Sequence, residues 1–180
     1  FLMRGGAVVV ASGNFILSPI QFQAGLSLEP IEDGLNNLLA SYGVTIGDSL
    51  VMDTQNEPFP MQMRRDLGGF SVLEMQSVDY PLFVDVRRDG MDSDSPIMAN
   101  LQSVTLQWAS PLEIDMIANQ DRTVERLLRT TEDAWLRDSF QVLPDLEAYP
   151  ELGFPVEGEP GEGEGVFAFF LIIFSMQIIT

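Results

Sequence analysis

The sequence contains no cysteine, no histidine and no lysine, and all nine of its basic residues are arginine. Without these side chains the chain cannot supply a Cys–His dyad, a Ser–His–Asp triad, a Schiff-base lysine or a histidine-rich zinc site. It also lacks the lysine of the G-x-x-x-x-G-K-[ST] loop that holds nucleotide phosphates. With no cysteine there is no disulfide, so the sequence indicates no redox compartment. We therefore predict neither a cofactor nor a metal.

Positive charge is scarce as well, because 9 arginines stand against 27 acidic residues and the net charge is −18. A field of this sign repels phosphate backbones, so nucleic acid is not an expected partner. A salt-adapted organism would explain the same composition without any ligand. Hydrophobic residues make up 46% of the chain, so it is expected to fold, and 180 residues suit one domain.

The N-terminal segment FLMRGG reads as the last turn of a helix, so we expect the fold to be incomplete at its N-terminus. The next residues, 7–11, form the apolar run AVVVA, which is typical of a strand buried on both faces. This order predicts an α/β fold, a mostly parallel sheet with flanking helices, as in flavodoxin-like proteins. Ser12 and Asn14 follow the run. They would lie at the carboxyl edge of the sheet, where such folds bind ligands, and are candidate ligand-binding residues.

A helix is predicted over residues 34–42, because four apolar residues share one face: Leu35, Leu38, Leu39 and Tyr42. We expect this stripe to lie in the core, so that Leu38→Ala would cost about 2–5 kcal/mol. Gly43 ends the helix, and short strands are predicted at residues 44–46 and 50–52.

A polar loop begins at Asp53 and includes Asn56. These two side chains are candidate ligand contacts at a strand exit. They are also residue types that satisfy free backbone groups where a chain turns, and this interpretation is favoured. A cap of that kind predicts that Asp53→Ala costs about 1 kcal/mol or less.

Further strands are predicted at residues 70–75 and 82–86, on either side of the turn-forming SVDYP. Residues 103–108 alternate between polar and apolar, as in a half-buried strand. Residues 122–135 combine a helix-like spacing of Val124, Leu127 and Leu128 with many threonines, so helix and strand both remain open.

Three acidic or apolar segments complete the chain. Asp89, Asp92 and Asp94 offer oxygen ligands, but their spacing lacks the glycine and glutamate of an EF-hand, so an acidic loop is expected. Residues 144–165 are rich in Glu, Gly and Pro and are predicted to be a solvated loop. Residues 166–180 are apolar but too short for an ordinary membrane span, which indicates a terminal strand or a truncated membrane anchor.

Several stretches resemble one known family. RGGAVVVASGNF, LNNLLASYGVTIGDSLVMD, ANLQSVTLQWASPLEI and RLLRTTEDAWL are similar to segments of the auxiliary components of ABC-type transport systems, including those associated with gliding motility. The resemblance touches most of residues 1–137. It implies a glutamine-amidotransferase-like α/β fold without the amidotransferase nucleophile. It also implies a membrane-anchored protein at the extracytoplasmic, periplasmic face of the cell membrane, attached through segments outside this chain.

The resemblance further implies that the partners are ABC permease and ATPase subunits, with ATP hydrolysis in a separate subunit. Residues 1–180 are accordingly expected to be a single extracytoplasmic domain fragment. Its expected function is non-enzymatic and consists of binding a partner subunit, a substrate or a cell-envelope component. The alternative is a carboxylate-dependent, α/β hydrolase-like enzyme, which rests on the fold class and on the abundance of acidic residues.

Overall fold

A computed structural model of the chain describes residues 10, 13–19, 26–31, 34–155 and 168–174. Within these residues the secondary structure is almost entirely β, with one short α-helix and one 3₁₀ turn. In chain order the elements are β1 (Phe15–Pro19), β2 (Leu26–Pro30), α1 (Leu35–Ala40), β3 (Val44–Ile46), β4 (Leu50–Met52), β5 (Phe59–Asp66), β6 (Ser71–Val78), β7 (Phe83–Arg87), η2 (Arg88–Gly90), β8 (Ser103–Gln107), β9 (Leu112–Ile114), β10 (Thr123–Arg129), β11 (Trp135–Arg137) and β12 (Ala168–Phe174).

The predicted α/β fold, whether flavodoxin-like or glutamine-amidotransferase-like, is wrong. Every pair of strands in the described residues is antiparallel. A parallel pair needs a crossover of a dozen or more residues, usually a helix, and α1 has six residues. The apolar run at residues 7–11, on which the prediction rested, lies almost wholly outside the described residues. Such runs also occur in antiparallel strands that are covered on both sides, so they do not fix strand direction.

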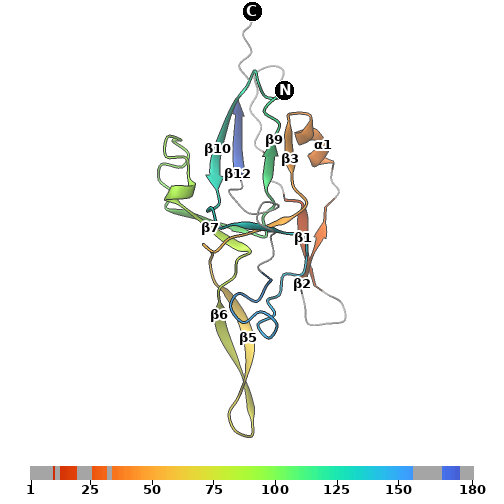
Figure 1. The fold of residues 1–180 in the computed structure, drawn as a ribbon, viewed down its shortest axis with the longest axis vertical. Helices are drawn as coiled ribbons and strands as arrows, with labels where there is room; N and C mark the ends of the chain where they lie inside the picture. The colour runs from red at the N-terminus through yellow and green to blue at the C-terminus, as the bar shows by residue number, and fades with distance from the viewer. Residues whose placement is uncertain (1–9, 11–12, 20–25, 32–33, 156–167, 175–180) are drawn as a thin grey trace, which may run out of the picture.

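The strands form small sheets at different levels of an elongated molecule (Figure 1). The largest described sheet has the order β10-β12-β9-β3 and occupies one end. The others have two strands each and pair β1 with β2, β4 with β11, β5 with β6, and β7 with β8. The β5–β6 hairpin forms the opposite end of the molecule from the large sheet.

Several local predictions are confirmed. β3 and β4 occupy the predicted residues, and β6, β7 and β8 overlap the strands predicted at 70–75, 82–86 and 103–108. Along β8, half-buried Val104 and Leu106 alternate with exposed polar neighbours. The segment left open at residues 122–135 contains a strand, β10, whose Leu127 and Leu128 are both buried.

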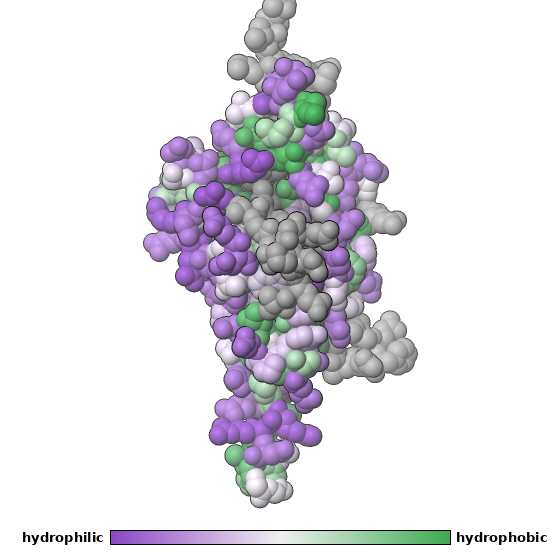
Figure 2. Space-filling model, viewed as in Figure 1, coloured by the Kyte–Doolittle hydropathy of each residue, from purple (hydrophilic) through white to green (hydrophobic). Residues whose placement is uncertain are grey.

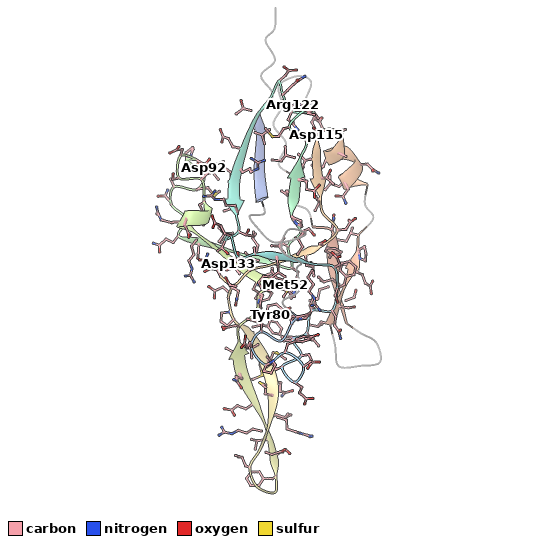
Figure 3. All side chains as sticks on the ribbon, in the orientation of Figure 1. Met52, Tyr80, Asp92, Asp115, Arg122 and Asp133 are labelled. Atoms are coloured by element: carbon pink, nitrogen blue, oxygen red, sulfur yellow. The ribbon has the colours of Figure 1, made fainter. Side chains whose placement is uncertain are left out.

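Tyr80 stands at the centre of the first of two core clusters, near Met52 in the middle of the molecule (Figure 3). Its ring lies 4.7 Å from the rings of both Phe59 and Phe83. Its hydroxyl donates to the Val142 carbonyl at 2.6 Å and accepts from the Trp108 indole N–H at 2.9 Å. Burial raises the pKa of Tyr80 to about 12, although the Trp108 hydrogen bond lowers it in part.

Helix α1 does not pack as predicted. None of its residues is buried, and Leu38 is 50% exposed. The helix ends at Ala40, so Tyr42, the fourth residue of the predicted stripe, lies outside it. The helix lies beside β3 at the edge of the large sheet, as Figure 1 shows. The expected loss of 2–5 kcal/mol for Leu38→Ala is therefore withdrawn, because no core cavity would form.

Strands β5 and β6 form a long hairpin that projects from the body, which we call the hairpin arm (residues 59–78; Figure 1). Its eight-residue strands pair throughout, from Phe59 opposite Val78 to Asp66 opposite Ser71. Gly68 and Gly69 form the turn with φ angles of 63° and 129°. Both lie in the region that favours glycine, which lets a two-residue turn follow the twist of the strands.

The two segments singled out near the C-terminus are partly described. Residues 144–155 form a compact turn, in which the Asp145 N–H donates to the Gly153 carbonyl at 2.7 Å and Phe154 is buried in the core. Ala168–Phe174 forms β12, which pairs with β10 and touches β9. The rest of the acidic loop and of the apolar tail lies outside the described residues.

Candidate functional site

Asp53 sits at the end of β4 and is 1% exposed. Its Oδ1 accepts hydrogen bonds from the Gln55 N–H at 2.9 Å and from the Thr131 hydroxyl at 2.7 Å. Its Oδ2 accepts from the Thr131 N–H at 2.9 Å. The carboxylate therefore caps its own turn and also ties that turn to the segment after β10, which is a larger role than the local cap expected from the sequence.

Asn56 closes the same turn from the other side. Its Oδ1 accepts from the Tyr80 N–H at 2.8 Å, and its Nδ2 donates to the carbonyls of Asp53 and Thr54 at 3.2 and 3.0 Å. Asn56 also forms an isolated β-bridge with Val84. These contacts are of the kind that satisfies backbone groups at a turn. A role for Asp53 and Asn56 in ligand binding remains a prediction.

Asn14, the candidate from the other predicted loop, is buried at a separate place. Its Nδ2 donates to the carbonyls of Ile46 and Gly47 at 3.2 and 2.9 Å, and its Oδ1 accepts from the Asn36 amide at 2.8 Å. Among the described residues it shares no hydrogen-bond partner with Asp53 or Asn56. Ser12 lies outside the described residues. The structure thus brings Asp53 and Asn56 together and leaves Asn14 apart from them.

A polar surface hollow of about 300 Å³ opens beside Asp53. Its lining residues come from the turn after β4, from β7 and η2, and from the end of β10: Asp53, Gln55, Asp85, Val86, Asp89, Gly90, Arg129, Thr130, Thr131 and Glu132. Four carboxylates and one arginine make this lining acidic. A lining of this kind suits hydroxyl or amine donors better than anions.

Asp85, in the middle of β7, is the unusual member of the lining, because it is a carboxylate that is 2% exposed. Its Oδ2 accepts from Arg87 Nε at 2.7 Å, whereas its buried Oδ1 has no hydrogen-bond partner among the described residues. This hydrogen bond and the negative charge of Asp85 raise the pKa of Arg87 above its ordinary value. Gln55 also contacts β7, because its side-chain amide donates to the Asp85 carbonyl at 2.5 Å.

Asp85 was not predicted as a site residue from the sequence. The available signal was a single acidic residue inside the apolar run LFVDV, where burial is costly unless the charge is paired. The hollow itself had no such signal, because its walls come from segments that are distant in the sequence.

The acidic loop after β7 is built from turns. The Asp89 carboxylate accepts from the Gly90 N–H, and that of Asp92 accepts from the Asp94 N–H. This loop lies beside β10 of the large sheet, as the Asp92 label in Figure 3 shows, and the Asp92 N–H donates to the Leu127 carbonyl at 3.1 Å. In the part of the chain that the structure describes, no three acidic side chains are grouped so as to hold a metal ion.

Comparison with known proteins gives one family. A family model described as "ABC-type uncharacterized transport system" matches residues 1–157. A curated relative from Borreliella burgdorferi, described only as an uncharacterized protein, is 25% identical over 114 residues, which is 63% of this chain. The chain spans 20% of that relative's length. No solved structure matches. Among the described residues, no helix has the length and apolar character needed to cross a membrane.

Proposed function

The chain belongs to the ABC-type uncharacterized transport system family, and from this premise we propose that it is a non-enzymatic auxiliary domain that binds a partner subunit of such a system. The observation that carries the proposal is the family match, which covers residues 1–157 and therefore most of the chain. The residue inventory agrees with it, because no cysteine, histidine or lysine is present to act as nucleophile or base.

The finer parts of the proposal concern partners and location. We place the domain at the extracytoplasmic face of the cell membrane, where it contacts the permease, with ATP hydrolysis in the ATPase subunit. The family description names a transport system and does not name gliding motility, so the proposal is limited to transport. The alternative of a hydrolase-like enzyme rested on an α/β fold and on the abundance of acidic residues, and the antiparallel sheets remove the first of these two supports.

The test is co-purification of the full-length protein with the permease and ATPase subunits proposed as its partners. The three proteins are co-expressed, the full-length protein is captured by a tag, and recovery of the other two is measured. We expect recovery of both, and none of the permease from an unrelated ABC system co-expressed as a control. Equal recovery of the two permeases, or of neither, would contradict the proposal.

A second measurement addresses the location. In cells with a permeabilised outer envelope and an intact inner membrane, added protease should cut the domain while a cytoplasmic marker stays intact. Protection of the domain until the inner membrane is broken would refute the extracytoplasmic placement.

A further inference from the structure

The hairpin arm is anchored at its base and uncovered beyond it. At the base, Val78 is buried and the Phe59 ring stacks on Tyr80. Beyond the base, β5 and β6 pair only with each other, so in the described structure both outer edges of the ribbon lack a neighbouring strand. An isolated two-stranded hairpin is marginally stable in water, so a third element that covers the arm would stabilise it.

The register divides the arm into two faces. Residues opposite each other in an antiparallel pair point to the same side, and side chains alternate along each strand. One face, which we call the inner face, carries Met61, Met63 and Val72, which are half-buried. The other face, which we call the outer face, carries Leu73 opposite Arg64 and Met75 opposite Gln62.

The outer face and the tip expose large apolar side chains. Leu73 and Met75 are both 64% exposed, and at the tip Leu67 and Phe70 are 45% and 65% exposed. Figure 2 shows hydrophobic surface at the end of the arm. Single exposed apolar residues are ordinary, but four within nine consecutive residues make a patch of the kind that marks an interaction site.

Charge distinguishes the arm from the rest of the chain. Residues 59–78 contain two arginines and two acidic residues, so the arm is neutral in a chain of net charge −18. Arg65 pairs with Glu74 at 3.6 Å on the inner face, and Asp66 accepts a hydrogen bond from Ser71. Arg64 stands on the outer face and has no ion-pair partner among the described residues. The outer face therefore combines an apolar patch with Arg64, which forms no ion pair in the described structure, and with Asp66, two residues further along the same strand.

We propose that the outer face and tip of the hairpin arm dock on the permease subunit of the same transport system, in an apolar groove bordered by a carboxylate that receives Arg64. The assignment rests on the proposed function, since it names the surface through which the auxiliary domain binds. Apolar burial supplies the attraction, and the Arg64–carboxylate pair fixes orientation. A second copy of this chain and an anionic lipid surface are disfavoured occupants, because both would repel a body of charge −18.

The main experiment extends the co-purification with two matched variants of the full-length protein. One carries Leu73→Glu and Met75→Glu on the arm. The control carries Met116→Glu and Ile117→Glu, which are 57% and 82% exposed in the β9–β10 loop. The Asp115 and Arg122 labels in Figure 3 place that loop at the opposite end from the arm. We expect permease recovery to fall at least tenfold for the arm variant and to stay at the wild-type level for the control.

Three outcomes would overturn the assignment of the arm. Wild-type recovery by a folded arm variant would show that the auxiliary domain binds elsewhere, and would leave the proposed function intact. An equal loss of permease recovery in both variants would show that the added negative charge alone, and not the site of the substitutions, weakens binding. If the wild-type protein itself recovered no permease, the proposed function would be overturned, and the assignment of the arm with it. A far-ultraviolet circular dichroism spectrum and a thermal melt establish that each variant is folded.

Arg64→Glu and Arg65→Glu separate the charge from the apolar patch. We expect Arg64→Glu to weaken permease recovery several-fold and Arg65→Glu to have a smaller effect, because Arg65 is on the inner face with Glu74. The reverse order would refute the assigned face.

A photo-crosslinking residue at position 73 identifies the occupant directly. We expect adducts with the permease from position 73 and none from position 117. Adducts between two copies of the chain would assign the arm to self-association instead. Binding of the wild type, but not of the Leu73→Glu, Met75→Glu variant, to phosphatidylglycerol vesicles would assign the arm to lipid. Either result would overturn the proposal.

Discussion

The hairpin arm and strand β7 are neighbours in the chain, and both are rich in apolar residues. Strand β7 is buried in the core, whereas the arm is exposed to water. β7 has four consecutive buried residues, including Asp85. β5 and β6, each eight residues long, contain one buried residue between them, Val78. This difference in burial comes from the elements that pack against each strand. The two buried valines of β7 pack in a cluster with Val51 of β4 and Leu127 of β10, whereas among the described strands β5 pairs only with β6.

The comparison shows that apolar content alone does not tell a core strand from a docking surface. In the core, an apolar side chain contributes by filling space that would otherwise be empty, and its removal leaves a cavity. On the arm, the same side chain contributes little to folding and is available to a partner. The predictions below test this division with matched residues.

The largest expected difference is between two leucines. Leu82 is fully buried in the Tyr80 cluster, so Leu82→Ala should lower the free energy of unfolding by about 2–5 kcal/mol. Leu73 is exposed on the arm, so Leu73→Ala should change it by less than about 0.5 kcal/mol. Urea unfolding of the wild type and both variants measures these values. Similar losses in both variants would mean that the arm is part of the cooperative core.

The next difference is between two aspartates. Asp53→Ala removes the acceptor of three hydrogen bonds and leaves the N–H of Thr131 without a partner, so we expect a loss of about 2–3 kcal/mol. Asp66→Ala on the arm removes one exposed bond, from Ser71, and should cost about 0.5 kcal/mol or less. The same urea experiment measures both. A loss of 1 kcal/mol or less for Asp53→Ala would return Asp53 to the simple cap expected from the sequence.

Tyr80 gives a smaller effect at neutral pH and a distinctive one at high pH. Tyr80→Phe removes the hydroxyl that joins Val142 and Trp108, which should cost about 1–2 kcal/mol. The folded pKa of about 12 is above the unfolded value of 10.0. Below pH 10 both states hold the proton. As pH rises from 10 to 12 the unfolded state loses it first, so wild-type stability falls, by about 1.4 kcal/mol for each unit between the two pKa values.

The composition makes the Tyr80 experiment clean. The chain has no lysine, histidine or cysteine, so none of these side chains contributes to a titration at high pH. Absorbance titration should show a phenolate step near pH 12 that is missing from Tyr80→Phe. Stability measured from pH 9 to 12 should fall less in that variant than in the wild type. Equal slopes in the two proteins would contradict the raised pKa.

Short strands could be predicted from the sequence because their signals are local. Val44–Ile46 and Leu50–Met52 are apolar runs bounded by glycine or polar turns, and they form β3 and β4 as expected. Their partners could not be predicted. β3 pairs with β9 and β4 pairs with β11, strands that are far away in the chain, and nothing in the runs specifies those partners. The fold class was predicted wrongly because the pairing of the strands could not be inferred from the local elements.

The candidate site shows the same limit. The polar turn at Asp53 was predictable, since aspartate and asparagine before a proline favour turns. The burial of Asp53 depends on Thr131, 78 residues later in the chain, and the hollow beside it needs three separate segments. Turn chemistry is local, whereas the depth of a side chain is decided by what folds over it.

Helix α1 provides the smallest expected effect and the sharpest check on that argument. Its leucine stripe predicted a core helix, but Leu38 is half exposed and no residue of α1 is buried. Alanine is also a better helix former than leucine, which offsets the loss of a partly exposed side chain. Leu38→Ala should therefore change the free energy of unfolding by less than about 0.5 kcal/mol, while Leu50→Ala in β4, which is fully buried, should cost about 2–5 kcal/mol. Urea unfolding of the two variants measures both changes in the free energy of unfolding. A loss of stability in Leu38→Ala as large as that in Leu50→Ala would show that the leucine stripe is part of the core and that the described packing of α1 is wrong.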